Sequence, residues 1–181
     1  MKNFRRSLGR SYVLLFIFTV FPLILGAGMK KVMDKIEIYN AKTGKVEKVD
    51  PVIKSDAEWK KILTSEQYEV MRSKGTELPF SKQCAIPRSG KGVYQCAGCR
   101  TDLFAYGKKF ESGTGWPSFF DPVSPLNIKL ERDFSHGTHR TEVSCARCGS
   151  HLGHVFDDGP PPTGKRYCIN TVTLKLSDQA A

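Results

Sequence analysis

Two C-x-x-C pairs constrain the fold of this chain more than any other feature of its sequence. The first pair is Cys96 and Cys99, and the second is Cys145 and Cys148. Four cysteine thiolates at this spacing can surround one zinc ion tetrahedrally. The 45 residues from 100 to 144 separate the pairs, which is longer than a compact zinc ribbon allows. The sequence therefore predicts a structural zinc site, one per chain, that clamps two distant hairpins together.

Two other interpretations of these cysteines stay open. An exported protein could oxidise each pair to a disulfide, although the tight C-x-x-C ring is strained and easily reduced. A redox-active pair of the thioredoxin type should open a helix within a βαβ unit. Neither pair precedes such a helix, so the zinc interpretation is preferred.

The first 28 residues differ from the rest of the chain. An apolar run over residues 12–25 ends in Gly26, Ala27 and Gly28. The run is preceded by the basic residues Lys2, Arg5, Arg6 and Arg10. It is shorter than the roughly 20 residues of a spanning helix, and the small residues are typical of a cleavage site. We expect residues 1–28 to be a signal peptide, or an uncleaved membrane anchor, of an exported, periplasmic protein.

Much of the positive charge belongs to this segment. Removing residues 1–28 removes four of the 28 Lys and Arg and none of the 18 Asp and Glu, so the net charge falls from +10 to +6. A modest excess of this kind is usually a solvated surface, and no nucleic-acid partner is indicated. Contact with a membrane is expected only through the N-terminal segment, if it stays uncleaved.

The remaining chain divides into an extension and a domain. Residues 29–53 alternate polar and apolar positions around a Gly-containing turn, which predicts a hairpin. Capping boxes beginning at Ser55 and Thr64 predict two short helices, with a left-handed cap at Gly75 ending the second. We expect the functional domain to span residues 54–178.

After Gly75, glycine and proline separate short segments rich in β-branched and aromatic residues. We expect strands at residues 93–96, 141–144 and 167–176, in a mainly β domain. In an extended strand, Arg166, Cys168 and Asn170 share one face, and Val172 and Leu174 should continue it into the core. The cationic neighbour should lower the pKa of the Cys168 thiol.

Two further segments carry polar or aromatic side chains suited to chemistry. His151 and His154 follow the second cysteine pair, and a histidine can carry a proton near neutral pH. The glycine-rich loop at residues 112–119 holds Trp116, braced by Pro117. Taken separately, each histidine and the tryptophan would more often be structural.

Together these segments resemble the B-type methionine sulfoxide reductases. The resemblance rests on residues 112–119 (SGTGWPSF), residues 151–156 (HLGHVF), residues 166–170 (RYCIN) and both C-x-x-C pairs, and it covers about residues 54–176. It implies two antiparallel sheets in a β-tent fold, with the zinc site away from the catalytic pocket. It also implies reduction of methionine-R-sulfoxide, free or protein-bound.

The resemblance further implies roles for individual residues. Cys168 would be the nucleophile and Trp116 the platform for the substrate's S-methyl group. A polar shell would consist of His151, His154, Asp158, Arg166 and Asn170. Attack by the Cys168 thiolate on the sulfoxide sulfur would release methionine and leave a sulfenic acid.

The chain departs from many of these relatives at Thr114, where they carry a resolving cysteine. Of the six cysteines, only Cys84 remains besides Cys168 and the two C-x-x-C pairs. We expect it to form a disulfide with Cys168 that a thioredoxin-like donor reduces. Two alternatives remain: a static disulfide between Cys84 and Cys168, or an idle Cys84 with direct reduction of the sulfenic acid by an external donor.

Two other classes of function stay open besides the enzyme. A zinc-stabilised binding module would use the cysteine pairs and the basic surface to hold a partner. A thiol electron carrier would cycle Cys84 and Cys168 without consuming sulfoxide. Neither explains why histidine, tryptophan, arginine and asparagine accompany Cys168.

Overall fold

The computed structural model describes residues 34–81 and 91–177 of the 181-residue chain, and all of them belong to the unit Met33–Ala181. Two predictions lie outside the described residues: the signal or anchor segment at residues 1–28, and Cys84. Within the described ranges, no helix is long and apolar enough to cross a membrane.

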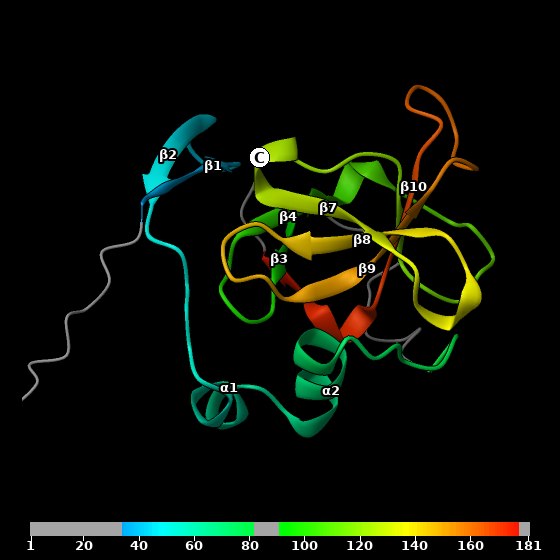
Figure 1. Ribbon diagram of the computed structural model, residues 1–181. Coiled ribbons are helices and arrows are strands. Elements are labelled where there is room, and N and C mark those ends of the chain that lie inside the picture. Colours follow the sequence, from blue (N-terminus) through cyan, green and yellow to red (C-terminus); the bar gives the residue numbers. More distant parts are fainter. Residues whose placement is uncertain (1–33, 82–90, 178–181) are drawn as a thin grey trace, which may run out of the picture. The chain divides into compact units, whose positions relative to one another are not determined.

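Antiparallel strands form most of the regular secondary structure in the described residues, so the prediction of a mainly β fold is confirmed (Figure 1). The larger sheet has the order β5-β6-β10-β9-β8-β7, and the smaller has the order β11-β3-β4. The strands of the larger sheet are β5 (Lys109–Phe110), β6 (Ser118–Phe119), β7 (Ile128–Asp133), β8 (Arg140–Cys145), β9 (His151–Phe156) and β10 (Arg166–Ile169). Those of the smaller sheet are β3 (Val93–Cys96), β4 (Asp102–Ala105) and β11 (Leu174–Ser177). Short 3-10 turns lie at η2 (Tyr106–Lys108), η3 (Pro125–Asn127), η4 (Ser135–Gly137) and η5 (Thr171–Thr173).

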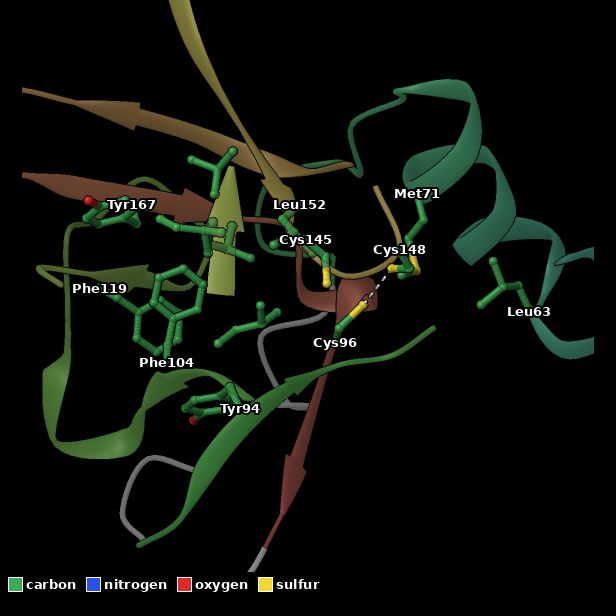
Figure 2. Packing of buried hydrophobic residues seen from close by; sticks show 14 of the residues in the cluster. Leu63, Met71, Tyr94, Cys96, Phe104, Phe119, Cys145, Cys148, Leu152 and Tyr167 are labelled. Carbon is green, nitrogen blue, oxygen red and sulfur yellow. Dashed lines mark hydrogen bonds between the residues drawn. The ribbon is translucent and has the colours of Figure 1, made fainter. Parts of the chain in front are cut away.

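Aromatic rings from both sheets form the core between them (Figure 2). Phe104 of β4 stacks on Phe119 of β6 with ring centroids 4.5 Å apart. Tyr94 of β3 contacts the same Phe119 ring edge-on at 5.2 Å, and Tyr167 of β10 lies 5.8 Å from Phe104. Burying each such side chain contributes about 1.5–3 kcal/mol. The strand that carries Cys168 is therefore anchored by its buried neighbour, Tyr167.

Two short helices precede the sheets, and both predicted capping boxes are confirmed. They are α1 (Asp56–Ile62) and α2 (Ser65–Ser73). At each N-terminus the hydroxyl of Ser55 or Thr64 accepts from the backbone amide three residues on. The side-chain oxygen of that residue, Glu58 or Gln67, accepts in turn from the backbone amide of Ser55 or Thr64. These reciprocal bonds satisfy helix-end amides that would otherwise lack partners.

The predicted left-handed cap at Gly75 is wrong by one residue. Lys74 carries the positive φ, 59°, and its amide bonds to the carbonyl of Glu69. The amide of Gly75 bonds to the same carbonyl at 3.1 Å. Lys74 also ion-pairs with Glu142 at 2.7 Å, and this tertiary contact favours an early end to the helix that the local sequence does not reveal.

The helices pack on the first cysteine pair. A Cβ atom at Gly98 would lie 3.3 Å from side-chain atoms of both Trp59 and Met71. Arg72 of α2 also donates to the carbonyl of Cys148 at 3.1 Å. The helices therefore contact both C-x-x-C segments and stabilise their arrangement.

The extension before α1 contains a hairpin of β1 (Ile36–Asn40) and β2 (Lys45–Val49). Gly44 has a φ of 68°, as the turn requires. The fully buried side chain of Asn127 binds both backbone groups of Tyr39, as a neighbouring strand would. It accepts from the Tyr39 amide and donates to the Tyr39 carbonyl, each at 2.7 Å.

The single strand expected at residues 167–176 is wrong, because the chain turns within it. β10 ends at Ile169, and the carbonyl of Asn170 accepts both the amide and the hydroxyl of Thr173. The chain then enters the other sheet as β11. Val172 and Leu174 consequently do not continue the face that carries Cys168.

Candidate active site and metal centre

Four cysteine sulfurs lie within 4.8 Å of one another and could hold one metal ion. Cys96 Sγ is 3.7 Å from Cys148 Sγ (Figure 2). Cys99 Sγ is 3.5 Å from Cys145 Sγ. A tetrahedral ion with metal–sulfur bonds of about 2.3 Å places its sulfurs about 3.8 Å apart. All four thiols are free, and these distances far exceed the roughly 2.05 Å of a disulfide. The donor set therefore fits a tetrahedral metal.

The two C-x-x-C segments have the same backbone structure. The amide of Cys96 bonds to the carbonyl of Thr101, and the amide of Cys145 bonds to that of Ser150, at 2.8 and 2.9 Å. Arg100 and Gly149 occupy equivalent left-handed positions, with φ values of 63° and 65°. A hydroxyl also lies 3.2 Å from the second sulfur of each segment. Two matching turns facing each other indicate one site built from both.

Cys168 lies on β10 between two strands of the larger sheet. It stands opposite His154 of β9 and Ser118 of β6. A Cβ atom at Gly153 would approach the Cys168 carbonyl oxygen to 2.1 Å, so no larger residue fits there without moving the strand. The glycine between the two histidines therefore sets the position of Cys168.

A pocket of about 120 Å³ opens beside the Cys168 thiol. Its remaining lining residues are Thr76, Trp116, Arg140, Gly153, His154, Phe156 and Asn170. Pockets for whole small molecules usually span about 300–1,000 Å³. This pocket therefore suits a group the size of one side chain.

The pKa of the Cys168 thiol is raised rather than lowered. Burial is the largest cause, and it outweighs the opposing effects of the Arg166 charge and of the hydroxyl of Thr114, which lies 4.0 Å from the sulfur. Arg166 makes two hydrogen bonds with Asp158, at 2.9 and 2.8 Å, and its guanidinium lies over Phe156. The sequence-based expectation of a lowered pKa is wrong, because it counted the cation and not the burial.

His151 and His154 lie on the same side of β9, although residues three apart in a regular strand face opposite sides. The register between β8 and β9 shifts between Val143 and Ser144, and this bulge restores a common side. The two rings meet edge to face, with centroids 5.4 Å apart.

The His154 ring is held by Asp133 of β7, which lies on the far side of β8 from β9. Its Nε2 lies 2.7 Å from the carboxylate of Asp133, which also accepts from Arg140 at 2.9 Å. Hydrogen bonds from Ser135, then that from His154, hold the pKa of Asp133 well below its usual range. A carboxylate bound at Nε2 fixes the orientation of the His154 ring.

His151 lies behind this pair and does not line the pocket. Its Nδ1 is 2.7 Å from Glu142, whose other oxygen pairs with Lys74. Burial lowers the pKa of His151, so its neutral form is favoured. Burial raises the pKa of Glu142, but the hydrogen bonds from Lys74 and His151 outweigh this effect and lower the pKa overall.

The loop before β6 brings Trp116 to the pocket. Ser112 Oγ lies 2.7 Å from Ser118 Oγ and closes the loop, while Gly113 and Gly115 have φ values of 73° and 88°. The half-buried Trp116 indole donates to the carbonyl of Glu77 at 3.2 Å. Trp116 thus forms a pocket wall rather than part of the core.

Comparison with known proteins decides the family. Residues 63–178 match the SelR domain model. The chain belongs to the B-type methionine sulfoxide reductase family. It is 58% identical over 128 residues to the peptide methionine sulfoxide reductase MsrB of Methanosarcina barkeri, covering 71% of this chain and 89% of that relative. The corresponding protein of Leptospira interrogans is 52% identical over 128 residues, with 71% and 97% covered, and that of Agrobacterium fabrum is 55% identical over 119 residues, with 66% and 87% covered.

Membership of the B-type reductase family confirms the resemblance drawn from the sequence motifs. Of the seven predicted site residues besides the cysteine pairs and Cys84, four line the pocket: Cys168, Trp116, His154 and Asn170. Arg166 lies beside the thiol, Asp158 holds Arg166 from the surface, and His151 lies behind His154. The β1–β2 hairpin precedes the matched residues.

Four charged residues that surround the predicted site residues were not expected from the sequence. They are Glu77, Asp133, Arg140 and Glu142. Asp133 stands opposite Arg140 across β7 and β8. Such cross-strand pairs depend on register, which no local motif announces.

The opposed effects on Cys168 give a testable pH dependence. Removing the positive charge in Arg166→Met should raise the thiol pKa further, since Asp158, left unpaired, acts in the same direction. A higher pKa means less thiolate at a given pH, so the midpoint of Cys168 alkylation by iodoacetamide should move to higher pH. Arg166→Lys keeps the charge and is the control. The assay uses a Cys84→Ser background, and an unmoved or lower midpoint contradicts the assignment.

Proposed function

We propose that this protein is an enzyme that reduces the R-epimer of methionine sulfoxide, free or protein-bound, to methionine. The observation that carries the proposal is the Cys168 thiol in a side-chain-sized pocket, facing a histidine and bordered by an indole, in a chain of this family. Relatives named peptide methionine sulfoxide reductase cover most of its domain, which supports the assignment of reaction and substrate.

The proposed reaction begins with Cys168. Its thiolate attacks the sulfoxide sulfur, while His154 protonates the sulfoxide oxygen. This attack forms a bond between the two sulfurs. As the protonated oxygen passes to the Cys168 sulfur, the S–O bond and the new sulfur–sulfur bond break, methionine leaves, and Cys168 is left as a sulfenic acid. The cysteine sulfur loses two electrons, and the substrate sulfur gains them. Burial raises the pKa of the Cys168 thiol and so leaves less thiolate. Protonation of the sulfoxide oxygen during the attack compensates for this, because it makes the substrate sulfur easier to attack.

The surrounding residues orient this step. Trp116 provides an apolar wall for the S-methyl group, and Arg166, held by Asp158, favours the thiolate. Asn170 borders the pocket with its side-chain amide fixed by the carbonyl of Leu152 at 3.0 Å. His151 acts through His154 rather than on substrate, because it does not line the pocket.

The sulfenic acid must then be reduced. We assign Cys84 to this step: its thiol attacks the Cys168 sulfenic acid, water leaves, and a thioredoxin-like donor reduces the resulting disulfide. Thr114 lies 4.0 Å from the Cys168 sulfur and cannot form a disulfide. The assignment of Cys84 rests on the sequence alone.

Replacing Cys84 separates this assignment from its alternatives. Cys84→Ser should release about one methionine per chain in a single turnover, but should not turn over repeatedly with a thioredoxin system. Thr114→Ser is the control and should keep both activities. Unchanged recycling in Cys84→Ser means direct reduction of the sulfenic acid. A native disulfide that blocks the first turnover until a strong reductant is added means a static bridge.

We propose zinc as the metal held by Cys96, Cys99, Cys145 and Cys148. Four thiolates without an open coordination position suit structural zinc, which supplies stability and no catalysis. Elemental analysis of the purified protein should find about one zinc per chain.

We also propose that residues 1–28 export the protein, as a cleaved signal or as an anchor, to the periplasm. Residues 29–53 then form an extension, and residues 54–178 form the catalytic domain. Electrons for an enzyme outside the cytoplasm must cross the membrane, which favours a membrane-linked thioredoxin-like donor. The N-terminal sequence of the mature protein, with cell fractionation, tests this proposal, and an intact N-terminus in the cytoplasm contradicts it.

The reaction is tested with separated epimers of methionine sulfoxide and dithiothreitol as reductant. We expect the R-epimer to be consumed and the S-epimer to remain. Oxidation of thiols without loss of either epimer would identify an electron carrier. Loss of neither, with a stable zinc site and inert thiols, would identify a binding module.

A further inference from the structure

Glu77 is a buried acidic residue that neither the sequence motifs nor the proposed reaction uses. It follows α2 and adjoins Thr76, which lines the Cys168 pocket, and only 7% of its surface is exposed. None of the ion pairs among residues 34–81 and 91–177 includes it. A buried charge is costly unless other groups satisfy it, so its partners indicate its role.

The carboxylate of Glu77 binds backbone amides directly after the Cys168 strand. One oxygen accepts from Thr171 at 2.5 Å, and the other accepts from Val172 at 3.1 Å. These are the first amides of η5, and the residue preceding them, Asn170, gives no side-chain cap. Charge-assisted bonds to backbone amides are stronger than neutral ones. Glu77 therefore replaces the missing cap from 94 residues away.

The backbone of Glu77 binds two residues of the pocket itself. Its amide donates to Asn170 Oδ1 at 3.1 Å, and its carbonyl accepts from Trp116 Nε1 at 3.2 Å. The Asn170 side chain also donates to Leu152, so both ends of its amide are bound. Glu77 thus connects Trp116, which forms one wall of the pocket, with the side-chain amide of Asn170 and with the turn that follows β10.

We propose that Glu77 is a positioning residue for sulfoxide reduction. Its carboxylate fixes the turn after Asn170, and its backbone then holds Trp116 at a set distance from Cys168. This inference rests on the proposed function, since it assigns Trp116 and Asn170 to the substrate pocket. Glu77 itself does not touch the substrate.

The test is Glu77→Gln, which keeps the shape but places an amide NH₂ against a backbone N–H. Trp116 should move, so KM for methionine-R-sulfoxide should rise and kcat/KM should fall about 10-fold to 100-fold, as expected when a reacting geometry is misplaced. A merely structural role would reduce the folded fraction, which lowers the apparent kcat and leaves KM unchanged. Glu37→Gln, on the exposed face of β1, should change neither constant.

Trp116 provides a readout independent of activity. The chain has two tryptophans, so Trp59→Phe leaves Trp116 as the only one, and its emission should shift in Trp59→Phe/Glu77→Gln. In addition, Glu77→Gln and Trp116→Phe should have non-additive effects on kcat/KM, because both break the same contact. If Glu77→Gln fails to fold, Glu77→Asp shortens the side chain and keeps its charge.

An unchanged KM with unchanged Trp116 emission in a folded variant overturns the proposal. Additive effects of Glu77→Gln and Trp116→Phe do the same. Failure of the proposed function is distinguishable: the wild type would then not consume the R-epimer, while the emission of Trp116 would still report whether Glu77 positions it.

Discussion

Cys168→Ser should abolish consumption of methionine-R-sulfoxide, reducing kcat/KM by about 10,000-fold or more. A serine hydroxyl is nearly the same size as the thiol but does not ionise near neutral pH. It also cannot take up the oxygen as a sulfenic acid. Because Cys168 is only half-buried, the fold should persist, with Tm within about 2 °C of the wild type.

Matched thermal melts separate lost chemistry from lost structure. The metal content of Cys168→Ser should equal that of the wild type, since the Cys168 sulfur is not one of the four clustered sulfurs. Activity remaining within tenfold of the wild type would show that another group performs the attack, and the assignment of Cys168 would then be wrong.

Cys145→Ser should have the opposite result, losing metal and stability. Cys145 is 1% exposed and joins the second C-x-x-C segment to the first, on which both helices pack. Structural zinc contributes about 10–16 kcal/mol in small finger peptides. Here an aromatic core remains, so we expect a smaller loss, seen as a decrease in Tm of at least about 10 °C. Prolonged chelation should produce the same decrease in the wild type.

Cys168→Ser is the control for Cys145→Ser, because each replaces one thiol by a hydroxyl. Metal content measured on both variants should fall only in Cys145→Ser. A Cys145→Ser protein that melts like the wild type, or wild-type protein unaffected by a chelator that removes its metal, would contradict the structural role of the site.

The sequence predicted the features that depend on local chemistry. The capping boxes at Ser55 and Thr64 and the metal-ligand spacing follow from side chains a few residues apart. Motifs shared with the family also identified Cys168, Trp116 and His154, which line one pocket. Each of these features can be recognised within a short stretch of chain.

Features that depend on distant contacts could not be predicted. The sequence of residues 167–176 is strand-like throughout, yet the chain turns at Asn170. Glu77 stabilises this turn by binding the backbone amides that follow it. The raised pKa of Cys168 comes from burial by other strands, which the neighbouring Arg166 does not reveal. The common side of His151 and His154 requires a bulge opposite β8. Strand register and burial, rather than composition, decide these details.

The central claim is that the Cys168 sulfur takes the oxygen from the R-epimer. It is tested most directly in Cys84→Ser protein mixed with an equal amount of methionine-R-sulfoxide and dimedone, which traps sulfenic acids. We predict about one dimedone adduct on Cys168 for each methionine released, and none with the S-epimer. Methionine released without an adduct on Cys168, or an adduct on another cysteine, would contradict the claim.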